Sequence, residues 1–247
     1  SKAVEQWTLA MTVKNRKQNR VALVILTRNE IDGMTALVEH IPFSSFTEVF
    51  AVDGGSTDGT LALFQKHRIK VYSQTSRGRG EAFRIAAERT KAEYIIFFSP
   101  DGNEDPADIL KFLPYADGSY DMVIASRMMK GAHNEEDDQP IKMRKWANNA
   151  FNLMANALFN RSGRFITDSI NGYRMIRRAV FDTLKPDGRG YTIEYQMTIR
   201  AMKARLRIAE FPTHEGPRIG GESYAKSIPT GIAFLKLLFS EIFTKKR

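Results

Sequence analysis

Largely apolar runs alternate with segments of mixed polarity along the first half of the chain. Such runs, of four to six residues, are typical of strands buried on both faces of a sheet. They predict strands at residues 21–26, 47–52, 69–72, 94–98 and 121–125. Segments predicted as helices follow these strands at residues 32–40, 60–67, 81–90 and from Ala107 onward. This alternation predicts an open, mostly parallel, Rossmann-like α/β sheet with helices on both faces.

The pattern changes after Met128. A charged loop comes first, and further elements are predicted as helices at residues 141–160 and 191–204, a strand at 207–211 and an amphipathic helix at 228–243. We therefore expect three parts. They are an N-terminal amphipathic and basic segment, a central α/β domain and a C-terminal amphipathic helix, at residues 1–20, 21–226 and 227–247.

Size and composition narrow the class of protein. The 247 residues, 43% of them hydrophobic, suffice for one substantial core. The absence of cysteine excludes a disulfide framework and a thiolate zinc site. No stretch approaches the roughly 18 to 20 consecutive apolar residues of a spanning helix, so we expect no helix of this chain to cross a bilayer.

The charge balance points to the kind of partner. Lysine and arginine outnumber aspartate and glutamate by 37 to 28, which gives a net charge of +9. This excess favours phosphate-bearing partners, namely nucleotides, anionic lipids or nucleic acid. Because the chain shows no zinc-finger or aromatic ribonucleoprotein pattern, we do not expect nucleic acid. A nucleic-acid-binding protein without catalysis is kept as an alternative of a different class.

Polar clusters follow three of the predicted strands, at the edge of the sheet where ligands bind in such folds. Asp53 ends one strand and precedes two glycines, so its carboxylate is placed to accept hydrogen bonds from a ribose or a base. A turn that caps the next helix would account for the same residues. The loop at residues 77–80 has two arginines and two glycines before a helix, which favours phosphate binding.

The third cluster, at residues 99–106, gathers three acids and one amide after a very apolar strand. Oxygen ligands of this kind suit Mg²⁺ or Mn²⁺, which usually complete their shell with water and substrate phosphates. We expect Asp101 and Asn103 to be the metal ligands, and Asp105 to cap the following helix. A solvated turn is the alternative.

Two motifs and the acidic loop together resemble family 2 glycosyltransferases of the GT-A fold. The motifs are residues 24–30 (VILTRNE) and 51–60 (AVDGGSTDGT), and the similarity runs from about residue 20 to residue 226. Within the family, the chain is most similar to dolichyl-phosphate mannose synthases and related polyprenyl-phosphate sugar transferases. This similarity implies that residues 21–226 form a GT-A catalytic domain.

The resemblance assigns roles on the donor side. It implies that Thr27, Asn29 and Glu30 line the nucleotide pocket, that Asp53 holds the base or ribose, and that Arg79 lies near it. The chain departs from the family at one position. Where a D-x-D motif is common, this sequence has Ser99-Pro100-Asp101, so only the second acid is retained. Metal use therefore depends on Asp101.

The resemblance also assigns roles on the acceptor side. Arg127, Arg174, Arg218 and Ser223 are candidates for binding the donor diphosphate or a lipid phosphate. Asp101 and Arg127 are expected to take part in catalysis, and Asp168 is the candidate base if the acceptor is a hydroxyl.

The implied reaction is an inverting hexose transfer. The donor is a GDP- or UDP-sugar and the acceptor a polyprenyl or dolichyl phosphate. A second version has a sugar hydroxyl of a polysaccharide or glycolipid as the acceptor.

The C-terminal segment carries an apolar stripe, formed by Ile232, Leu235, Leu238, Phe239, Ile242 and Phe243. With the basic residues 245–247, this stripe suits a helix that lies in the headgroup layer of an anionic membrane. Packing onto the protein's own core, or onto a second copy in a homo-oligomer, would explain the same stripe. Residues 1–20 allow the same interpretations. The expected location is peripheral, on the cytoplasmic face of a membrane.

Overall fold

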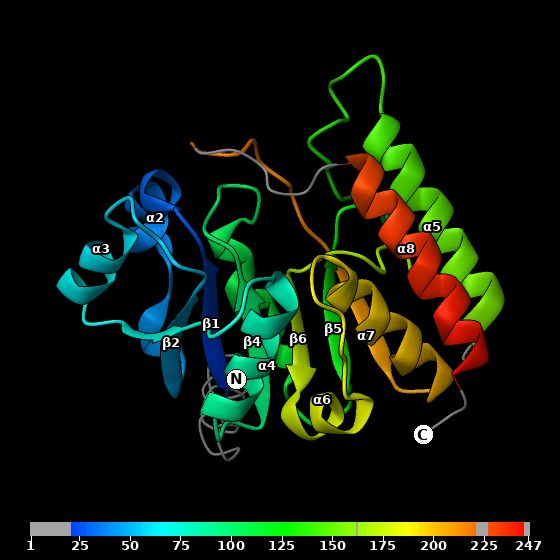
Figure 1. The fold of residues 1–247 in the computed structure, drawn as a ribbon, viewed down its shortest axis with the longest axis horizontal. Helices are drawn as coiled ribbons and strands as arrows, with labels where there is room; N and C mark the ends of the chain where they lie inside the picture. The colour runs from blue at the N-terminus through cyan, green and yellow to red at the C-terminus, as the bar shows by residue number, and fades with distance from the viewer. Residues whose placement is uncertain (1–20, 162, 221–226, 245–247) are drawn as a thin grey trace, which may run out of the picture.

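A computed structural model describes residues 21–161, 163–220 and 227–244 of the chain. Its sheet has seven strands in the order β3-β2-β1-β4-β6-β5-β7 (Figure 1). Only β6 runs antiparallel to its neighbours β4 and β5. The bounds are β1 Val21–Thr27, β2 Glu48–Asp53, β3 Lys70–Ser73, β4 Tyr94–Phe98, β5 Met122–Ser126, β6 Arg174–Arg177 and β7 Ile208–Pro212. The predicted open, mostly parallel sheet is confirmed.

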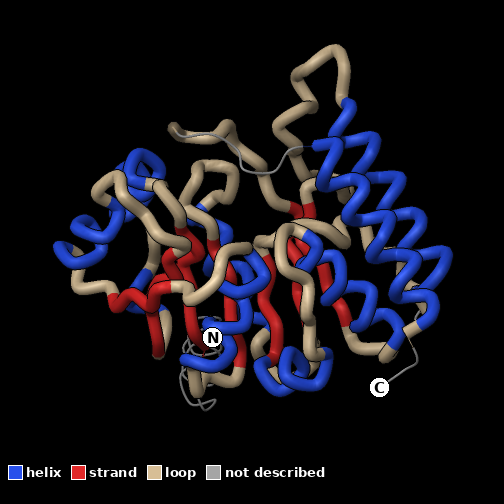
Figure 2. The backbone as a smooth tube through the Cα atoms, in the orientation of Figure 1, coloured by secondary structure: helices blue, strands red, loops and turns tan. Residues whose placement is uncertain are grey.

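Helices cover both faces of the sheet (Figure 2). The α-helices are α2 Ile31–Leu37, α3 Thr60–Lys66, α4 Arg79–Arg89, α5 Met143–Phe159, α6 Arg178–Leu184, α7 Thr192–Lys203 and α8 Ser227–Phe243. Three 3₁₀ helices are η1 Val38–His40, η2 Phe43–Ser45 and η3 Pro106–Tyr115. Because η3 has 3₁₀ geometry, the helix that was predicted from Ala107 is present in a tighter form.

The alternation of side chains along β1 divides the core in two. Ala22, Val24 and Leu26 belong to the cluster that includes side chains of α4, α5, α7 and α8. Leu23 and Ile25 belong to the opposite cluster, with side chains of α2, α3 and η3. Successive strand residues point to opposite faces of a sheet, so a fully apolar strand requires cover on both. Every residue of β1 is buried.

The predicted C-terminal helix is present as α8, and it packs on α5 and α7. Phe234 lies 5.2 Å from both Phe151 and Tyr195, measured between ring centroids. The amphipathic character of α8 is not confirmed, because apolar side chains occupy its exposed side as well as its buried side. Leu238, one residue of the predicted apolar stripe, is buried, whereas Ile232, Phe239 and Phe243 are exposed.

Within the described residues, no helix combines the length and apolar character that spanning a bilayer would require. Residues 1–20, Ser223 and the basic residues 245–247 lie outside the described part of the chain. Predictions about them stay predictions, as do the domain bounds at residues 20 and 226.

Candidate active site

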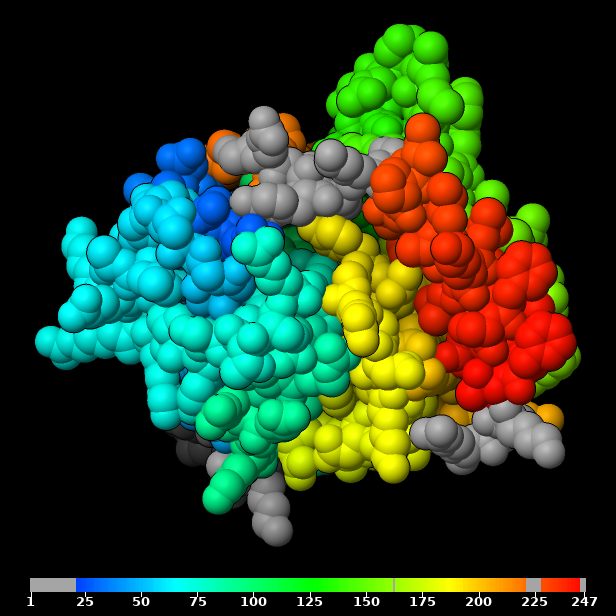
Figure 3. Space-filling view, in the orientation of Figure 1, coloured from blue at the N-terminus to red at the C-terminus, as the bar shows by residue number. Residues whose placement is uncertain are grey.

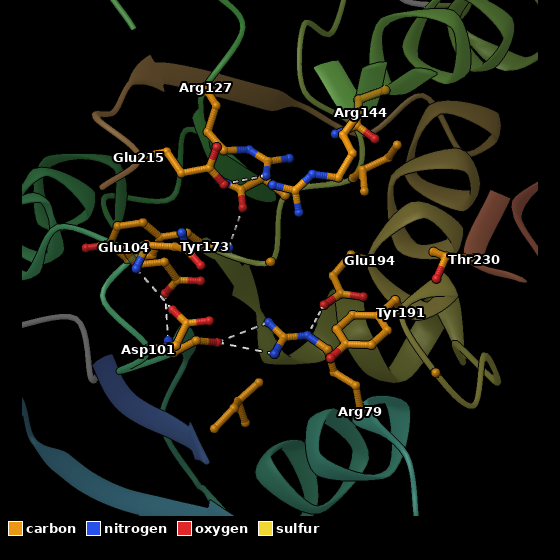
Figure 4. A pocket seen from close by; sticks show the side chains of 18 of the residues that line it. Arg79, Asp101, Glu104, Arg127, Arg144, Tyr173, Tyr191, Glu194, Glu215 and Thr230 are labelled. Atoms are coloured by element: carbon orange, nitrogen blue, oxygen red, sulfur yellow. Dashed lines mark hydrogen bonds and ion pairs between the residues drawn. The ribbon is translucent and has the colours of Figure 1, made fainter. Parts of the chain in front are cut away.

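A cavity of about 740 Å³ lies beyond the carboxyl ends of β1, β4 and β5. One part of its wall is charged and comes from the strand-end loops and α4. Another part comes from α5 and α8 and is mixed: Met143, Ala147, Phe151, Ile228 and Phe234 line it together with the polar side chains of Arg144, Lys145, Asn148 and Thr230. Figure 4 shows acidic and basic side chains from distant parts of the sequence facing one another across this space. The cavity therefore offers charged and apolar surfaces to one bound ligand or a pair of them.

Arg218 joins two carboxylates at the charged wall. Its Nη1 donates to Asp101 Oδ2 at 2.7 Å and its Nη2 donates to Glu30 Oε1 at 2.6 Å. Burial raises the pKa of Glu30 to about 7, against the opposing effect of Arg218. Burial also raises the pKa of Asp101 above its ordinary value. The structure thus brings together three of the residues that the sequence predicted for this site.

Backbone contacts hold Arg218 over the acidic loop. Ile219 N donates to Asp101 O at 2.7 Å, and Gly216 N donates to Asn103 O at 3.1 Å. Asn103 Nδ2 also donates to Gly216 O at 2.8 Å. Residues 216–219 therefore lie along the loop that carries the expected metal ligands.

Arg79 begins α4 and reaches into the same cavity. Its guanidinium pairs with Glu194 of α7 and donates to Ser99 Oγ, at 3.2 Å from both Nη1 and Nη2. The Arg79 and Tyr191 side chains lie on the same side of the cavity in Figure 4, with the guanidinium carbon 5.8 Å from the ring centroid. Arg79 therefore lines the cavity, and its contact with a donor stays a prediction.

Arg127, at the end of β5, is held by two acids. Its Nε donates to Asp168 Oδ2 at 2.8 Å and its Nη1 donates to Glu215 Oε1 at 2.9 Å. Arg127 and Glu215 line the cavity, whereas Asp168 is fully buried and does not. The expectation that Asp168 acts as a general base is therefore wrong for this geometry, because its carboxylate is enclosed and bound by Arg127. Asp168 is a positioning residue.

Asp53 and Asn29 support the turn after β2, beside the cavity, through hydrogen bonds to its backbone. Asp53 Oδ2 accepts from the backbone N–H groups of Gly55 and Ser56, and Asn29 Oδ1 accepts from Thr57 N. Neither side chain lines the cavity, although Thr27 and Gly54 do. Asp53 is engaged within its own turn, and Asn29 contacts the turn after β2 through Thr57, so both support the wall; direct contact of either side chain with a nucleotide stays a prediction.

Arg174 lies in the protein interior, away from the cavity wall. It is fully buried, and its guanidinium donates to Glu194 O at 2.9 Å and to Thr198 Oγ1 at 3.0 Å. The expectation that Arg174 binds a phosphate is wrong, because these partners fix it between β6 and α7. Its burial also lowers its pKa to about 10.

The acidic loop offers a metal ion a partial set of ligands. Asp101 and Asn103 both line the cavity, and Asn103 uses its Nδ2 in hydrogen bonds, which leaves its Oδ1 for a metal. Glu30 Oε2 is buried without a hydrogen-bond partner among the described residues. In that part of the chain, no three His, Cys, Asp or Glu side chains are grouped as metal ligands. These residues fit an ion whose shell is completed by water and a bound diphosphate.

Five cavity acids were not assigned a role from the sequence: Glu104, Glu135, Glu136, Glu194 and Glu215. Burial and the nearby charge of Asp101 raise the pKa of Glu104 well above its ordinary value. Glu104 belongs to the acidic loop, so its position was visible in the sequence. Glu194 and Glu215 had no such signal, because each is a single acid whose partner arginine lies 115 or 88 residues away.

The charged cavity at the carboxyl ends of an open, mostly parallel sheet defines an α/β protein suited to a phosphate-bearing ligand. Residues 22–185 match the family model described as "Glycosyl transferase family 2", and the chain belongs to this family. The resemblance found in the sequence motifs is thereby confirmed.

Curated relatives cover most of the chain. The polyprenol monophosphomannose synthase of Mycolicibacterium smegmatis is 27% identical, over 80% of this chain and 77% of its own. The undecaprenyl-phosphate mannosyltransferase of Micrococcus luteus is 29% identical, over 83% of this chain and 86% of its own. The glycosyltransferase AglJ of Haloferax volcanii is 29% identical over 81% of this chain, but the match covers only 64% of AglJ.

Solved structures of the glucosyl-3-phosphoglycerate synthase from Mycobacterium tuberculosis share the fold. Its complex with Mn²⁺, UDP and phosphoglyceric acid has a TM-score of 0.72 at 18% identity, and the match covers 92% of this chain and 80% of that one. Its complex with Mn²⁺ and UDP-glucose has a TM-score of 0.71 at 20% identity, and the match covers 97% of this chain and 84% of that one. At this level of identity, the similarity shows a common fold.

Proposed function

We propose that this protein transfers a hexose from a nucleotide diphosphate sugar to a polyprenyl phosphate at a membrane surface. The observation that carries the proposal is the continuity of the cavity, which joins the charged wall at Asp101 and Arg218 to the wall of α5 and α8, where apolar side chains lie beside Arg144 and Lys145. A nucleotide sugar needs the first surface, and a lipid chain needs the second. The relatives named for polyprenol and undecaprenyl-phosphate substrates support the same acceptor class.

In this proposal the nucleotide-sugar donor binds at the carboxyl ends of β1 and β4. Thr27 Oγ1 and Glu30 Oε2 are both buried without hydrogen-bond partners among the described residues, so each is available to a ligand group. A divalent ion held by Asp101 and Asn103 would offset the negative charge of the departing diphosphate. The Mn²⁺ complexes of the structural neighbour support this assignment.

In the same proposal the phosphate of the lipid acceptor binds to Arg127. The second pKa of a phosphate monoester is about 6, so one more oxygen is largely anionic at neutral pH and attacks without a strong general base. That oxygen forms a bond to the anomeric carbon while the bond from this carbon to the donor diphosphate breaks, with inversion. Arg127 orients the acceptor phosphate because Asp168 and Glu215 fix its guanidinium.

A sugar hydroxyl is a less suitable acceptor for this site. A hydroxyl must lose its proton in the reaction, and Asp168, the candidate base, is enclosed away from the cavity, so another acid of the lining such as Glu104 or Glu215 would have to take that role. An anionic lipid phosphate places no such demand on the protein. We therefore prefer the lipid phosphate.

Exposed apolar side chains suit the protein to a lipid surface. On α5 they include Met143, Trp146 and Leu153, and on α8 they include Ile228, Ile232, Phe239 and Phe243. The two helices pack against each other, and α8, in red, forms the right-hand part of the surface seen in Figure 3. We propose that this surface, here called the α5–α8 face, rests on the cytoplasmic leaflet and admits the lipid chain. A second copy of the chain is the alternative occupant.

Sugar transfer in detergent tests the proposed function. Purified protein is incubated with radiolabelled GDP- or UDP-hexoses, Mn²⁺ and a polyprenyl phosphate, and the lipid extract is separated chromatographically. We expect a labelled lipid and released nucleoside diphosphate with at least one donor. The matched control is the polyprenol of the same length without its phosphate, which should accept no sugar. Equal transfer to the free polyprenol, or transfer only to water-soluble sugars, would contradict the proposed acceptor.

A further inference from the structure

Ser99 occupies the position of the first acid in the D-x-D pattern, and it contacts a cation. The Arg79 guanidinium donates to Ser99 Oγ through both Nη1 and Nη2, at 3.2 Å each. We propose that Ser99 and Glu194 position Arg79 as a fixed cationic contact for the donor diphosphate, so that part of diphosphate binding is independent of metal. This inference rests on the proposed function and adds two positioning residues to it.

Glu194 fixes the guanidinium from the opposite side. The Glu194 side chain is buried and pairs with Arg79 Nε through one oxygen, whereas its other oxygen has no hydrogen-bond partner among the described residues. Although burial opposes ionisation of Arg79, the charges of Glu194 and Glu104 hold its pKa above the ordinary value. Arg79 therefore remains a cation in the wall of the cavity.

The backbone around Arg79 leaves room for this arrangement. A Cβ atom added to Gly172 would lie 2.3 Å from Arg79 Nη2 and 3.1 Å from Glu194 Oε1. Gly80, the second residue of α4, approaches the segment that precedes α7 so closely that its added Cβ would lie 1.8 Å from Gly188 O. Two glycines thus allow α4, the loop before β6 and the start of α7 to converge on the guanidinium.

A carboxylate at position 99 would change the charge of this wall. It would lie against the Arg79 guanidinium, pair with it and reduce its attraction for phosphate. It would also add a second negative charge two residues from Asp101, which repels a diphosphate unless a metal ion is bound. Serine keeps the hydrogen bonds to Arg79 and adds no charge. The residue at position 99 therefore determines how strongly donor binding depends on metal.

Binding of GDP and UDP, measured by titration calorimetry in EDTA and in Mn²⁺, tests the inference without an acceptor. The variants Ser99→Asp and Ser99→Asn form a matched pair of nearly equal size that differ in charge. With the nucleotide that binds the wild type, we expect Ser99→Asp to bind in EDTA at least about 10-fold more weakly than Ser99→Asn. In Mn²⁺ the difference in nucleotide affinity between the two variants should be smaller.

A third variant tests the position of Arg79 without altering a charge. Gly172→Ala places a methyl group against Arg79 Nη2, at a residue whose φ is not in the left-handed region. We expect it to weaken binding in EDTA by about 10-fold while circular dichroism and the melting temperature confirm that it folds.

The outcomes separate the inference from the proposed function. The inference is overturned if Ser99→Asp binds in EDTA as tightly as Ser99→Asn, if Gly172→Ala binds as the wild type does, or if the wild type binds only in Mn²⁺. If the folded wild type binds neither GDP nor UDP in Mn²⁺, the proposed function fails as well. Metal-independent binding by the wild type, together with selective loss in Ser99→Asp and Gly172→Ala, supports the inference.

Discussion

Arg218 Nη1 lies 2.7 Å from Asp101 Oδ2, across 117 residues of sequence. The same guanidinium also pairs with Glu30, so one cation bridges a carboxylate that follows β1 and another that follows β4. A metal ion that binds at Asp101 has to share this carboxylate with Arg218 or displace it. Arg218 would then be free to contact the phosphates that arrive with the ion.

The first prediction concerns Asp101. We expect Asp101→Asn to lower kcat/KM for sugar transfer at least about 100-fold, because a neutral amide binds the metal ion more weakly than the charged carboxylate does. The asparagine retains an oxygen that accepts from Asn103 N, so circular dichroism should report an unchanged fold. Asp182→Asn, which alters an exposed acid of α6 paired with Arg178, is the control and should keep full activity. Full activity in Asp101→Asn would refute the metal role.

The second prediction concerns the buried pair of Asp168 and Arg127. Asp168→Ala should lower the free energy of unfolding by about 3 to 5 kcal/mol, because it leaves the Arg127 guanidinium without its main partner in a largely buried position. Denaturant unfolding measures this loss. Asp182→Ala removes one partner of an exposed ion pair and should cost about 0 to 1 kcal/mol. Equal losses in the two variants would show that Asp168 has no positioning role.

The third prediction is a dependence of stability on pH that originates in Glu30. Its pKa is raised to about 7 in the folded protein, from 4.5 as the ordinary value. Below pH 4.5 the group is protonated in both states. As the pH rises toward 7, the unfolded state loses this proton first, so Glu30 destabilises the fold progressively.

Glu30→Gln removes this titration and offers a direct comparison. The melting temperature of Glu30→Gln minus that of the wild type should increase between pH 4.5 and about 8, whatever constant offset results from the altered contact with Arg218. A change of roughly 2 to 4 °C corresponds to 1 kcal/mol in a chain of this size. A difference that stays constant across this range would contradict the raised pKa.

The fourth prediction tests the α5–α8 face. Phe239→Glu and Ile232→Glu place a charge on exposed apolar positions of α8 and should reduce co-sedimentation with vesicles of anionic lipid by at least about 5-fold. Leu61→Glu makes the same change at an exposed residue of α3 and should leave binding intact. If vesicle binding is unchanged and light scattering shows a dimer that Phe239→Glu dissociates, the face binds a second copy.

The sequence indicated most of the sheet because its strands have a clear signal. The predicted strand at residues 94–98 coincides with β4, and the others that were predicted differ from the observed strands by one residue at one or both ends. β6 was not predicted, because its four residues begin and end with arginine and form no apolar run. Its antiparallel direction depends on pairing with β4 and β5, which are distant in sequence.

The candidate site could be predicted where its residues lie in motifs. Glu30 and Asp101 follow apolar strands in polar clusters, and the structure places both in one cavity with Arg218. Glu194 had no comparable signal, because its pairing with Arg79 arises only when α4 and α7 meet. Arg174 and Asp168 resembled ligand-binding residues in sequence, but the fold encloses both.

By itself, the sequence determined the order of apolar strands and helices, the family and the edge of the sheet where ligands bind, because these depend on local periodicity and on short contiguous motifs. Only the tertiary structure decided which polar side chains face the cavity and which are buried as supports. Burial and ion pairing depend on neighbours from remote segments, as Arg79 with Glu194 and Arg218 with Asp101 illustrate.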